Sequence, residues 1–270
     1  MAQAQADRDD SRTLRWISGG DLAKIRKKLV MVIGCGGTGS LFTLFAGQLG
    51  VEQLVVVDDD IVEASNLSRF VNASTQDVGR RKVDVVCADL TNRLPRCAIQ
   101  VIPDRFPSER VIRIMAERRP LVVGCLDAVK PRVELDISCR RFGLTYIDIG
   151  TGFNHDDSDY VLSSGGQVLI SRVGAACIMC MGFQHVADTR GYAAPGVDIP
   201  AGSVLTLNAV VVAMGLEILA AEARGTSLAF NVLRFDRGSL VSGTELVAPD
   251  PDCRVCGAKA GSISDILPGW

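Results

Sequence analysis

The stretch Leu29-Val30-Met31-Val32-Ile33-Gly34-Cys35-Gly36-Gly37-Thr38-Gly39 decides how this chain folds. Residues 29–33 form a continuous apolar run of strand length, which ends directly in a glycine-rich turn. Residues 38–49 then repeat apolar side chains with helical spacing and close at Gly50. The order strand, tight turn, helix is typical of the beginning of a unit in which two parallel strands flank a helix.

A second β-branched run, residues 53–57, ends at Asp58 and completes that unit. Strands that are buried on both faces have such continuous apolar runs, so the pattern predicts a parallel sheet. Further helices are predicted over 82–93, 108–118 and 131–142, and further strands over 99–102, 121–125 and 145–149. The fold class is therefore α/β, with a doubly wound, Rossmann-like, mostly parallel sheet.

The sequence changes in character near Gly150. Hairpin-like strands are predicted over 160–163, 167–171, 231–235 and 239–247, on either side of a long apolar helix that starts after Gly202. We expect an N-terminal arm and helix over 1–28, a Rossmann-like subdomain over 29–150 and a second subdomain over 151–270. Antiparallel strands of the last part should extend the parallel sheet within one compact domain, and residues 1–10 should form a mobile arm.

Composition narrows the class of protein. The 270 residues are 47 % hydrophobic, which supports a substantial core, and 29 basic against 31 acidic residues leave no cationic excess for binding nucleic acid. The first thirty residues lack the order of a secretory signal, so a cytoplasmic protein is expected. The apolar run 203–221 is long enough to be considered for a membrane span, but Asn208 and Glu217 interrupt it, which favours a buried helix.

The glycine turn predicts an adenine-nucleotide site. Its glycines are Gly34, Gly36, Gly37 and Gly39, in the pattern G-x-G-x-x-G between a strand and a helix. Glycines let the backbone approach a phosphate, and the helix N-terminus offers free N–H groups to the anion. Asp58 follows at close to the roughly 20-residue spacing of the acid that binds a ribose hydroxyl. Two alternatives remain for this turn. NAD-dependent dehydrogenases have the same motif, and a glycine turn can also exist only to let a helix pack closely on a strand.

Two polar segments favour ATP chemistry over hydride transfer. Residues 59–70 read DDIVEASNLSRF and residues 77–82 read DVGRRK. Attack on the α-phosphorus of ATP builds negative charge, which Arg69 could stabilise by binding two oxygens and Lys82 as a point charge. Asp127, beyond the strand 121–125, is placed to hold magnesium at the carboxyl edge of the sheet. Singly each could be a solvated surface charge, but their ordered occurrence together favours a site.

With these motifs the chain resembles the ThiF/MoeB/HesA family, which is related to ubiquitin-activating enzymes. The resemblance rests on the glycine turn, D-x-D-x-V-x-x-S-N-L-x-R, D-V-G-x-x-K and the later aspartate, and covers residues 29–148 closely. It implies an adenylyltransferase that uses ATP and Mg2+, with residues 29–150 as the ATP-binding subdomain and residues 151–270 as the partner-binding subdomain. The implied roles are ribose binding for Asp58, orientation of the site for Asp60, phosphate contact for Asn66, Arg69 and Lys82, and magnesium binding for Asp127; the catalytic residues would be Arg69, Lys82 and Asp127. A homodimer is also implied, in which Arg12 or Arg15 could complete the neighbouring site, although residues 11–17 match the relevant motif poorly.

Two C-x-x-C pairs predict a second centre. Cys177, Cys180, Cys253 and Cys256 supply four thiolates, the usual set for a closed tetrahedral zinc site without an open position for substrate. We therefore expect structural Zn2+ that joins the hairpin region to the C-terminal tail. A thioredoxin-like role is disfavoured because neither pair follows a strand of a βαβ unit. The other five cysteines read as small core residues of a reduced compartment: Cys35, Cys87, Cys97, Cys125 and Cys139.

A missing cysteine refines the expected reaction. Relatives that form a thioester carry a cysteine between the first zinc pair and the long apolar helix, and residues 181–203 contain none. The predicted function is thus adenylylation of a small β-grasp protein of the ubiquitin-like or sulfur-carrier class at the carboxylate of its C-terminal glycine. Pyrophosphate would be released, and no thioester would form. Cys139 is the thiol to suspect otherwise, since two neighbouring arginines could lower its pKa.

Other readings stay open at this point. The same site could adenylylate a peptide or a modified tRNA base, the chain could be a scaffold that binds nucleotide without turnover, or it could be a dehydrogenase. The neutral charge balance and the cysteine pairs disfavour the tRNA version. His155 and His185 are expected to be polar loop residues, because a carboxylate nucleophile is already ionised at neutral pH and needs no general base.

Overall fold

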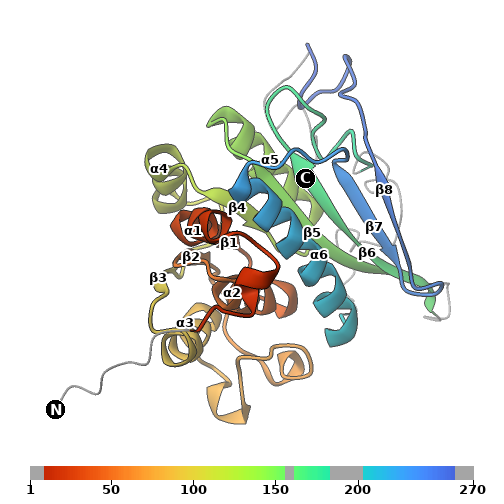
Figure 1. Ribbon diagram of the computed structural model, residues 1–270. Coiled ribbons are helices and arrows are strands. Elements are labelled where there is room, and N and C mark those ends of the chain that lie inside the picture. Colours follow the sequence, from red (N-terminus) through yellow and green to blue (C-terminus); the bar gives the residue numbers. More distant parts are fainter. Residues whose placement is uncertain (1–8, 156–160, 183–202, 259–270) are drawn as a thin grey trace.

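The computed structural model describes residues 9–155, 161–182 and 203–258, which fold around one sheet of eight strands (Figure 1). The strands lie in the order β3-β2-β1-β4-β5-β6-β7-β8. Their bounds are β1 (Leu29–Ile33), β2 (Gln53–Val57), β3 (Ala98–Ile102), β4 (Leu121–Gly124), β5 (Tyr146–His155), β6 (Val161–Ser171), β7 (Val232–Asp236) and β8 (Val241–Glu245).

The sheet is parallel from β3 to β5 and antiparallel from β5 to β8. Ile33 at the end of β1 pairs in register with Val57 of β2 on one side and with Gly124 of β4 on the other. The strand order reverses between β1 and β4, because β2 and β3 lie on one side of β1, and β4 and β5 on the other; ligands of doubly wound folds bind at such a point. The predicted fold class is confirmed, including the antiparallel extension.

Helices cover both faces of the sheet because the central strands β1, β2 and β4 carry buried apolar side chains on both sides. Val30 and Val32 belong to the core under α1 (Gly19–Lys27), α2 (Gly37–Leu49), α3 (Lys82–Arg93) and α6 (Leu205–Arg224). Met31 and Ile33 belong to the core under α4 (Glu109–Arg118) and α5 (Val129–Arg141). Short 3-10 turns at Thr13–Arg15, Ala64–Asn66 and Thr75–Asp77 complete the described elements.

Within the described residues, helix α6 is the one helix that is long and apolar enough to cross a membrane by length and composition alone. In the fold it packs against α2 and against β5 and β6 (Figure 1). Half of the residues in its apolar stretch are buried inside the protein. The structure thus uses α6 as a core helix, as Asn208 and Glu217 led us to expect.

Most predicted elements differ from the observed ones by one or two residues at an end, and β1, β2 and α3 have the predicted bounds. The prediction of two strands over 160–163 and 167–171 is wrong, because one strand, β6, runs from Val161 to Ser171. Gly165 and Gly166 do not make a turn: they pair with Asp236 and Phe235 of β7, where a Cβ on Gly165 would lie 2.5 Å from the Phe235 carbonyl oxygen.

Strand β5 is also longer than predicted and runs through Gly150 to His155, because its second half pairs with β6. The proposed division at residue 150 therefore falls inside a strand that both parts share, and it stays a prediction about function. Residues 1–8 of the expected N-terminal arm lie outside the described residues.

Candidate nucleotide site and four-cysteine centre

The glycine turn between β1 and α2 combines close packing with one open position. Gly34 has a φ of +90°, and a Cβ there would lie 2.6 Å from the carbonyl oxygen of Cys125 at the end of β4. A Cβ on Gly39 would lie 1.9 Å from the Gly34 carbonyl oxygen. A Cβ on Gly36, by contrast, would meet no atom within 4 Å. The outer glycines thus allow the turn to form, and the middle one leaves room for a ligand beside the N-terminus of α2.

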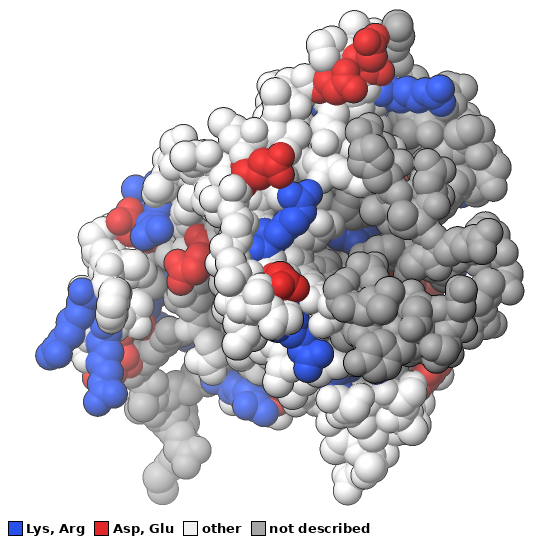
Figure 2. Space-filling model, turned by 90° about the vertical axis from the view of Figure 1, so that its right-hand side faces the viewer, with Lys and Arg blue, Asp and Glu red and all other residues white. Residues whose placement is uncertain are grey.

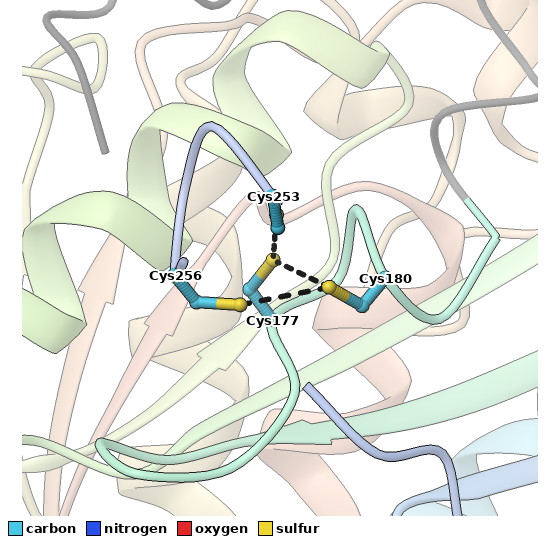
Figure 3. A group of neighbouring side chains, drawn as sticks. All are labelled: Cys177, Cys180, Cys253 and Cys256. Atoms are coloured by element: carbon cyan, nitrogen blue, oxygen red, sulfur yellow. Dashed lines mark hydrogen bonds between the residues drawn. The ribbon is translucent and has the colours of Figure 1, made fainter. Parts of the chain in front are cut away.

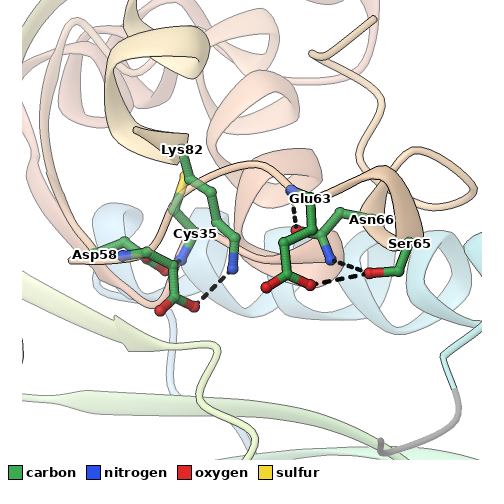
Figure 4. Close-up of polar contacts among 7 residues, drawn as sticks. Cys35, Asp58, Glu63, Ser65, Asn66 and Lys82 are labelled. Atoms are coloured by element: carbon green, nitrogen blue, oxygen red, sulfur yellow. Dashed lines mark hydrogen bonds and ion pairs between the residues drawn. The ribbon is translucent and has the colours of Figure 1, made fainter. Parts of the chain in front are cut away.

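Asp58 joins this turn to the segment after β2. Its Oδ2 accepts a hydrogen bond of 2.5 Å from the backbone N–H of Cys35, which lies beside it in Figure 4. Its Oδ1 accepts a hydrogen bond of 2.8 Å from Asp60 N–H. Burial raises the pKa of Asp58, and the two backbone hydrogen bonds and the charge of Lys82 offset only part of that effect. The carboxylate is therefore held at the edge of the sheet before any ligand arrives.

Lys82, the first residue of α3, reaches the same edge. Its Nζ donates to Oδ2 of Asp60 at 2.7 Å. Figure 4 shows the Lys82 side chain extending toward the segment after β2. The isolated bridge between Ile61 and Arg81 holds the two segments together. The Lys82 side chain is 12 % exposed and that of Asp60 is 64 % exposed. The ammonium group is thus packed into the protein and oriented by a carboxylate at the surface.

Arg69 lies over the glycine turn. Its Cγ is 3.0 Å from the position that a Cβ on Gly37 would take, and its Nη1 donates to the Ser65 carbonyl oxygen at 2.8 Å. Asn66 bonds residues of its own turn, since its Oδ1 accepts from Glu63 N–H at 3.2 Å and its Nδ2 donates to Ser65 Oγ at 3.3 Å (Figure 4). Ser65 Oγ in turn donates to Glu63 Oε2 at 3.1 Å. The turn Ala64–Asn66 therefore shapes the loop that presents Arg69.

Asp127 lies in the segment between β4 and α5 and is exposed. β4 is the neighbour of β1, so this segment and the glycine turn leave adjacent strands at the same edge. Asp58, Asp59 and Asp60 add carboxylate oxygens within 4.8 Å of one another at that edge. Oxygen ligands of this kind suit magnesium. The magnesium role of Asp127 and the roles of the other residues stay predictions.

Asn208 reaches the same turn from α6 and was not predicted as a site residue. Its side chain is fully buried, and its Nδ2 is 2.8 Å from the position of a Cβ on Gly37. The amide also bonds Ser203 at 3.0 Å and accepts from Thr151 Oγ1 at 3.3 Å. Its signal in the sequence is an amide inside an apolar helix, which by itself argues only against a membrane span.

The four paired cysteines form one cluster (Figure 3). The Sγ atoms of Cys177 and Cys180 are 3.7 Å apart, and each is 3.5 Å from a sulfur of the second pair, Cys253 or Cys256. A tetrahedral zinc with bonds of about 2.3 Å sets its sulfurs about 3.8 Å apart, so the four thiols fit this ion. Burial raises the pKa of the Cys177 thiol, so a bound cation has to displace protons.

The thiol suspected of thioester chemistry is poorly suited to it. Cys139 is fully buried, and burial together with the charge of Asp136 raises its pKa well above the ordinary value. The expectation that neighbouring arginines lower this pKa is therefore wrong. Arg12 and Arg15 are exposed. His155 is the last residue of β5, and its side chain is not described. Residues 183–202, which include His185 and most of the loop without a cysteine, lie outside the described residues.

A family model described as "ThiF family" matches residues 10–254. The chain belongs to the ThiF family. It is 28 % identical over 268 residues to the sulfur carrier protein ThiS adenylyltransferase of Escherichia coli, and the matched region covers 94 % of this chain and 97 % of that protein. It is 28 % identical over 245 residues to the SAMP-activating enzyme E1 of Haloferax volcanii, which covers 88 % of this chain and 83 % of that one.

Among solved structures, E. coli MccB with ATP superposes with a TM-score of 0.68 at 19 % identity, over 88 % of this chain and 69 % of that one. This likeness supports the ThiF fold. The names of the sequence relatives confirm the expectation of an adenylyltransferase at the level of the family.

Proposed function

We propose that this ThiF-family protein uses ATP to adenylylate the C-terminal glycine carboxylate of a small β-grasp protein of the ubiquitin-like or sulfur-carrier class. The observation that supports this best is the gathering of the glycine turn, Asp58, Arg69 and Lys82 at one edge of the sheet. The partner class is supported by the near full-length match to a ThiS adenylyltransferase.

In the proposed reaction, a carboxylate oxygen of the partner attacks the α-phosphorus of ATP. The new acyl–oxygen–phosphorus bond forms as the bond from the α-phosphorus to the bridging oxygen breaks, and pyrophosphate leaves with the electron pair. The attacking carboxylate is ionised at neutral pH, so a general base is not required. The demand on the protein is to position two anions and stabilise their charge.

The residues at the carboxyl edge of the sheet would each bind a different part of ATP or its magnesium ion. Asp58 would accept hydrogen bonds from the ribose, and the backbone near Gly36 would receive phosphate oxygens at the start of α2. Arg69 and Lys82, with the amide of Asn66, would bind the charge that develops on the phosphates, while Asp60 orients Lys82. Asp127 would hold Mg2+, which when bound supplies further charge stabilisation at the phosphates.

Zinc is proposed as a structural ion at the four cysteines. The donor set is closed, and it joins the segment after β6 to the chain after β8. Because residues 181–203 lack a cysteine and Cys139 is buried, we propose that the adenylate itself is the product and that no thioester forms on this chain. Its acceptor would be a separate component.

We further propose a cytoplasmic homodimer in which Arg12 or Arg15, both exposed, could reach a neighbouring site. On the face shown in Figure 2, Lys and Arg side chains are interspersed with Asp and Glu, which suits a protein partner better than nucleic acid. Adenylylation of a peptide or a tRNA base would use the same nucleotide residues, so the acceptor carboxylate has to be tested directly.

The test incubates the purified chain with ATP, Mg2+ and one of two carrier proteins: the ThiS protein of E. coli, or the small β-grasp protein encoded nearest to this gene. Pyrophosphate release that depends on a carrier is the expected result. The same carrier without its last glycine should give none. Release without any carrier would argue for another acceptor, and nucleotide binding without release would argue for a scaffold.

A further inference from the structure

Helix α5 carries three polar side chains on the face that it turns toward the sheet and the four-cysteine centre. Arg132, Asp136 and Arg140 are spaced four residues apart, and such residues lie on one side of a helix. Arg132 and Asp136 are 1 % and 0 % exposed. Buried charges are costly unless they bond specific partners, so each has to be accounted for.

Arg132 fixes the helix to the sheet. Its guanidinium pairs with both carboxylate oxygens of Asp148 on β5, with Nε at 2.9 Å from Oδ1. Tyr146 donates to the same carboxylate at 2.6 Å. A Cβ on Gly124 would lie 2.5 Å from the Tyr146 hydroxyl, so the cluster fits only beside a glycine. The position of α5 relative to β4 and β5 is thereby set.

Asp136 bonds the first cysteine pair. Its Oδ2 accepts a hydrogen bond of 2.9 Å from the backbone N–H of Ile178, the residue that follows Cys177. Its Oδ1 is buried without a hydrogen bond of ordinary geometry among the described residues, although the Ser171 hydroxyl acts on the same carboxylate. An apolar side chain would avoid the cost of that unpaired oxygen. The carboxylate is thus explained by what it holds, which is the backbone between the two thiols.

Arg140 holds the chain on the other side of Cys177. Its Nη1 donates to Ser171 Oγ at 2.9 Å and to the Arg172 carbonyl oxygen at 2.8 Å, and its Nη2 donates to the Ala175 carbonyl oxygen at 2.8 Å. Cys177 is therefore bracketed, within two residues on each side, by anchors from one helix.

We propose that Asp136 and Arg140 are positioning residues of the four-cysteine centre, which hold the Cys177–Cys180 turn in a metal-binding conformation before the ion arrives. Neither side chain belongs to the sulfur ligand set. Groups that orient metal ligands from outside typically contribute 10- to 100-fold to metal affinity. The inference rests on the zinc assignment of the proposed function, but not on the adenylylation activity.

The test measures metal release from the full chain. Wild type and variants are loaded with Zn2+, and the rate of transfer to a chromogenic chelator is followed; the Co2+-loaded forms are compared by their thiolate absorption bands. Asp136→Ala and Arg140→Ala should each release zinc about 10-fold faster or more. Asp136→Asn, whose amide oxygen can accept the same Ile178 N–H, should release it at close to the wild-type rate. Glu134→Ala, on the same helix, is the matched control.

The outcomes separate positioning from a merely structural role. If the two residues only stabilise the fold, Asp136→Ala and Arg140→Ala lower the melting temperature of the metal-free chain but leave the release rate and the cobalt spectrum unchanged, and the proposal is wrong. If Asp136→Ala fails to fold, Arg140→Ala alone decides. A wild-type chain that binds neither ion overturns the proposal together with the zinc assignment, whereas pyrophosphate release tests the reaction independently.

Discussion

The backbone N–H of Cys35 donates to the carboxylate of Asp58 at 2.5 Å, and this contact joins the ends of the two strands that define the nucleotide site. Cys35 lies inside the glycine turn after β1, and Asp58 follows directly on β2. The same carboxylate accepts from Asp60, whose own side chain bonds Lys82. One carboxylate therefore links the phosphate turn to a proposed catalytic cation.

This relationship predicts how ATP binding depends on pH. Because burial raises the pKa of Asp58, acidification protonates it at a higher pH than an ordinary aspartate near 3.8. The protonated form loses acceptor capacity for the ribose, so ATP affinity should fall as the pH is lowered through that raised pKa. Isothermal titration calorimetry at a series of pH values measures this change in ATP affinity. Asp58→Asn should bind ATP more weakly with a flatter profile, and an unchanged pH dependence in that variant would exclude Asp58 as the titrating group.

The two kinds of glycine in the turn should respond differently to alanine. Gly39→Ala brings a Cβ to 1.9 Å from a carbonyl oxygen and should markedly lower the melting temperature. Gly36→Ala meets no protein atom within 4 Å, so its stability should be close to wild type. Its methyl group would instead occupy phosphate space and weaken ATP binding by about an order of magnitude, or about 1.4 kcal/mol. Unchanged ATP affinity in Gly36→Ala would favour a turn that serves packing alone.

Arg69 and Lys82 should matter for turnover more than for folding. Arg69→Ala and Lys82→Ala are each expected to lower kcat for pyrophosphate release by about 10²- to 10³-fold, the effect of removing one charge-stabilising group. Arg113→Ala removes an exposed ion pair with Glu109 on α4 and serves as the control. Variants that retain wild-type kcat while melting normally would show that these cations are only surface charges.

The four-cysteine centre should contain metal and support stability. Freshly purified protein is expected to carry about one zinc per chain by atomic emission, because four sulfurs within 4.8 Å form one closed site. Replacing Cys253 and Cys256 by serine should remove the zinc and lower the melting temperature. Cys87→Ser, outside the cluster, should do neither. Protein that is fully folded and free of zinc would refute the assignment.

The sequence was sufficient to predict the parts of the fold and the site that depend on local sequence pattern. The apolar runs at 29–33 and 53–57, each followed by a turn or carboxylate, predicted β1, β2 and the position of Asp58 at one edge, because parallel strands end together. The cluster of four cysteines followed from ligand spacing. The roles of Asn208 and Asp136 could not be predicted, since each depends on a tertiary contact with a segment remote in sequence. The same holds for Cys139, whose burial outweighs the charges beside it in the chain.

The most direct test of the central claim is the fate of the carrier protein after incubation with ATP and Mg2+. The account predicts a carrier that gains the mass of AMP, is captured by hydroxylamine, and leaves no thiol-sensitive conjugate on a non-reducing gel. Asp127→Ala should abolish that product while its circular dichroism and melting temperature remain those of wild type. A thiol-sensitive conjugate that disappears in Cys139→Ala would contradict the adenylate-only reaction, and an unmodified carrier in the presence of folded, zinc-loaded enzyme would contradict the proposed function itself.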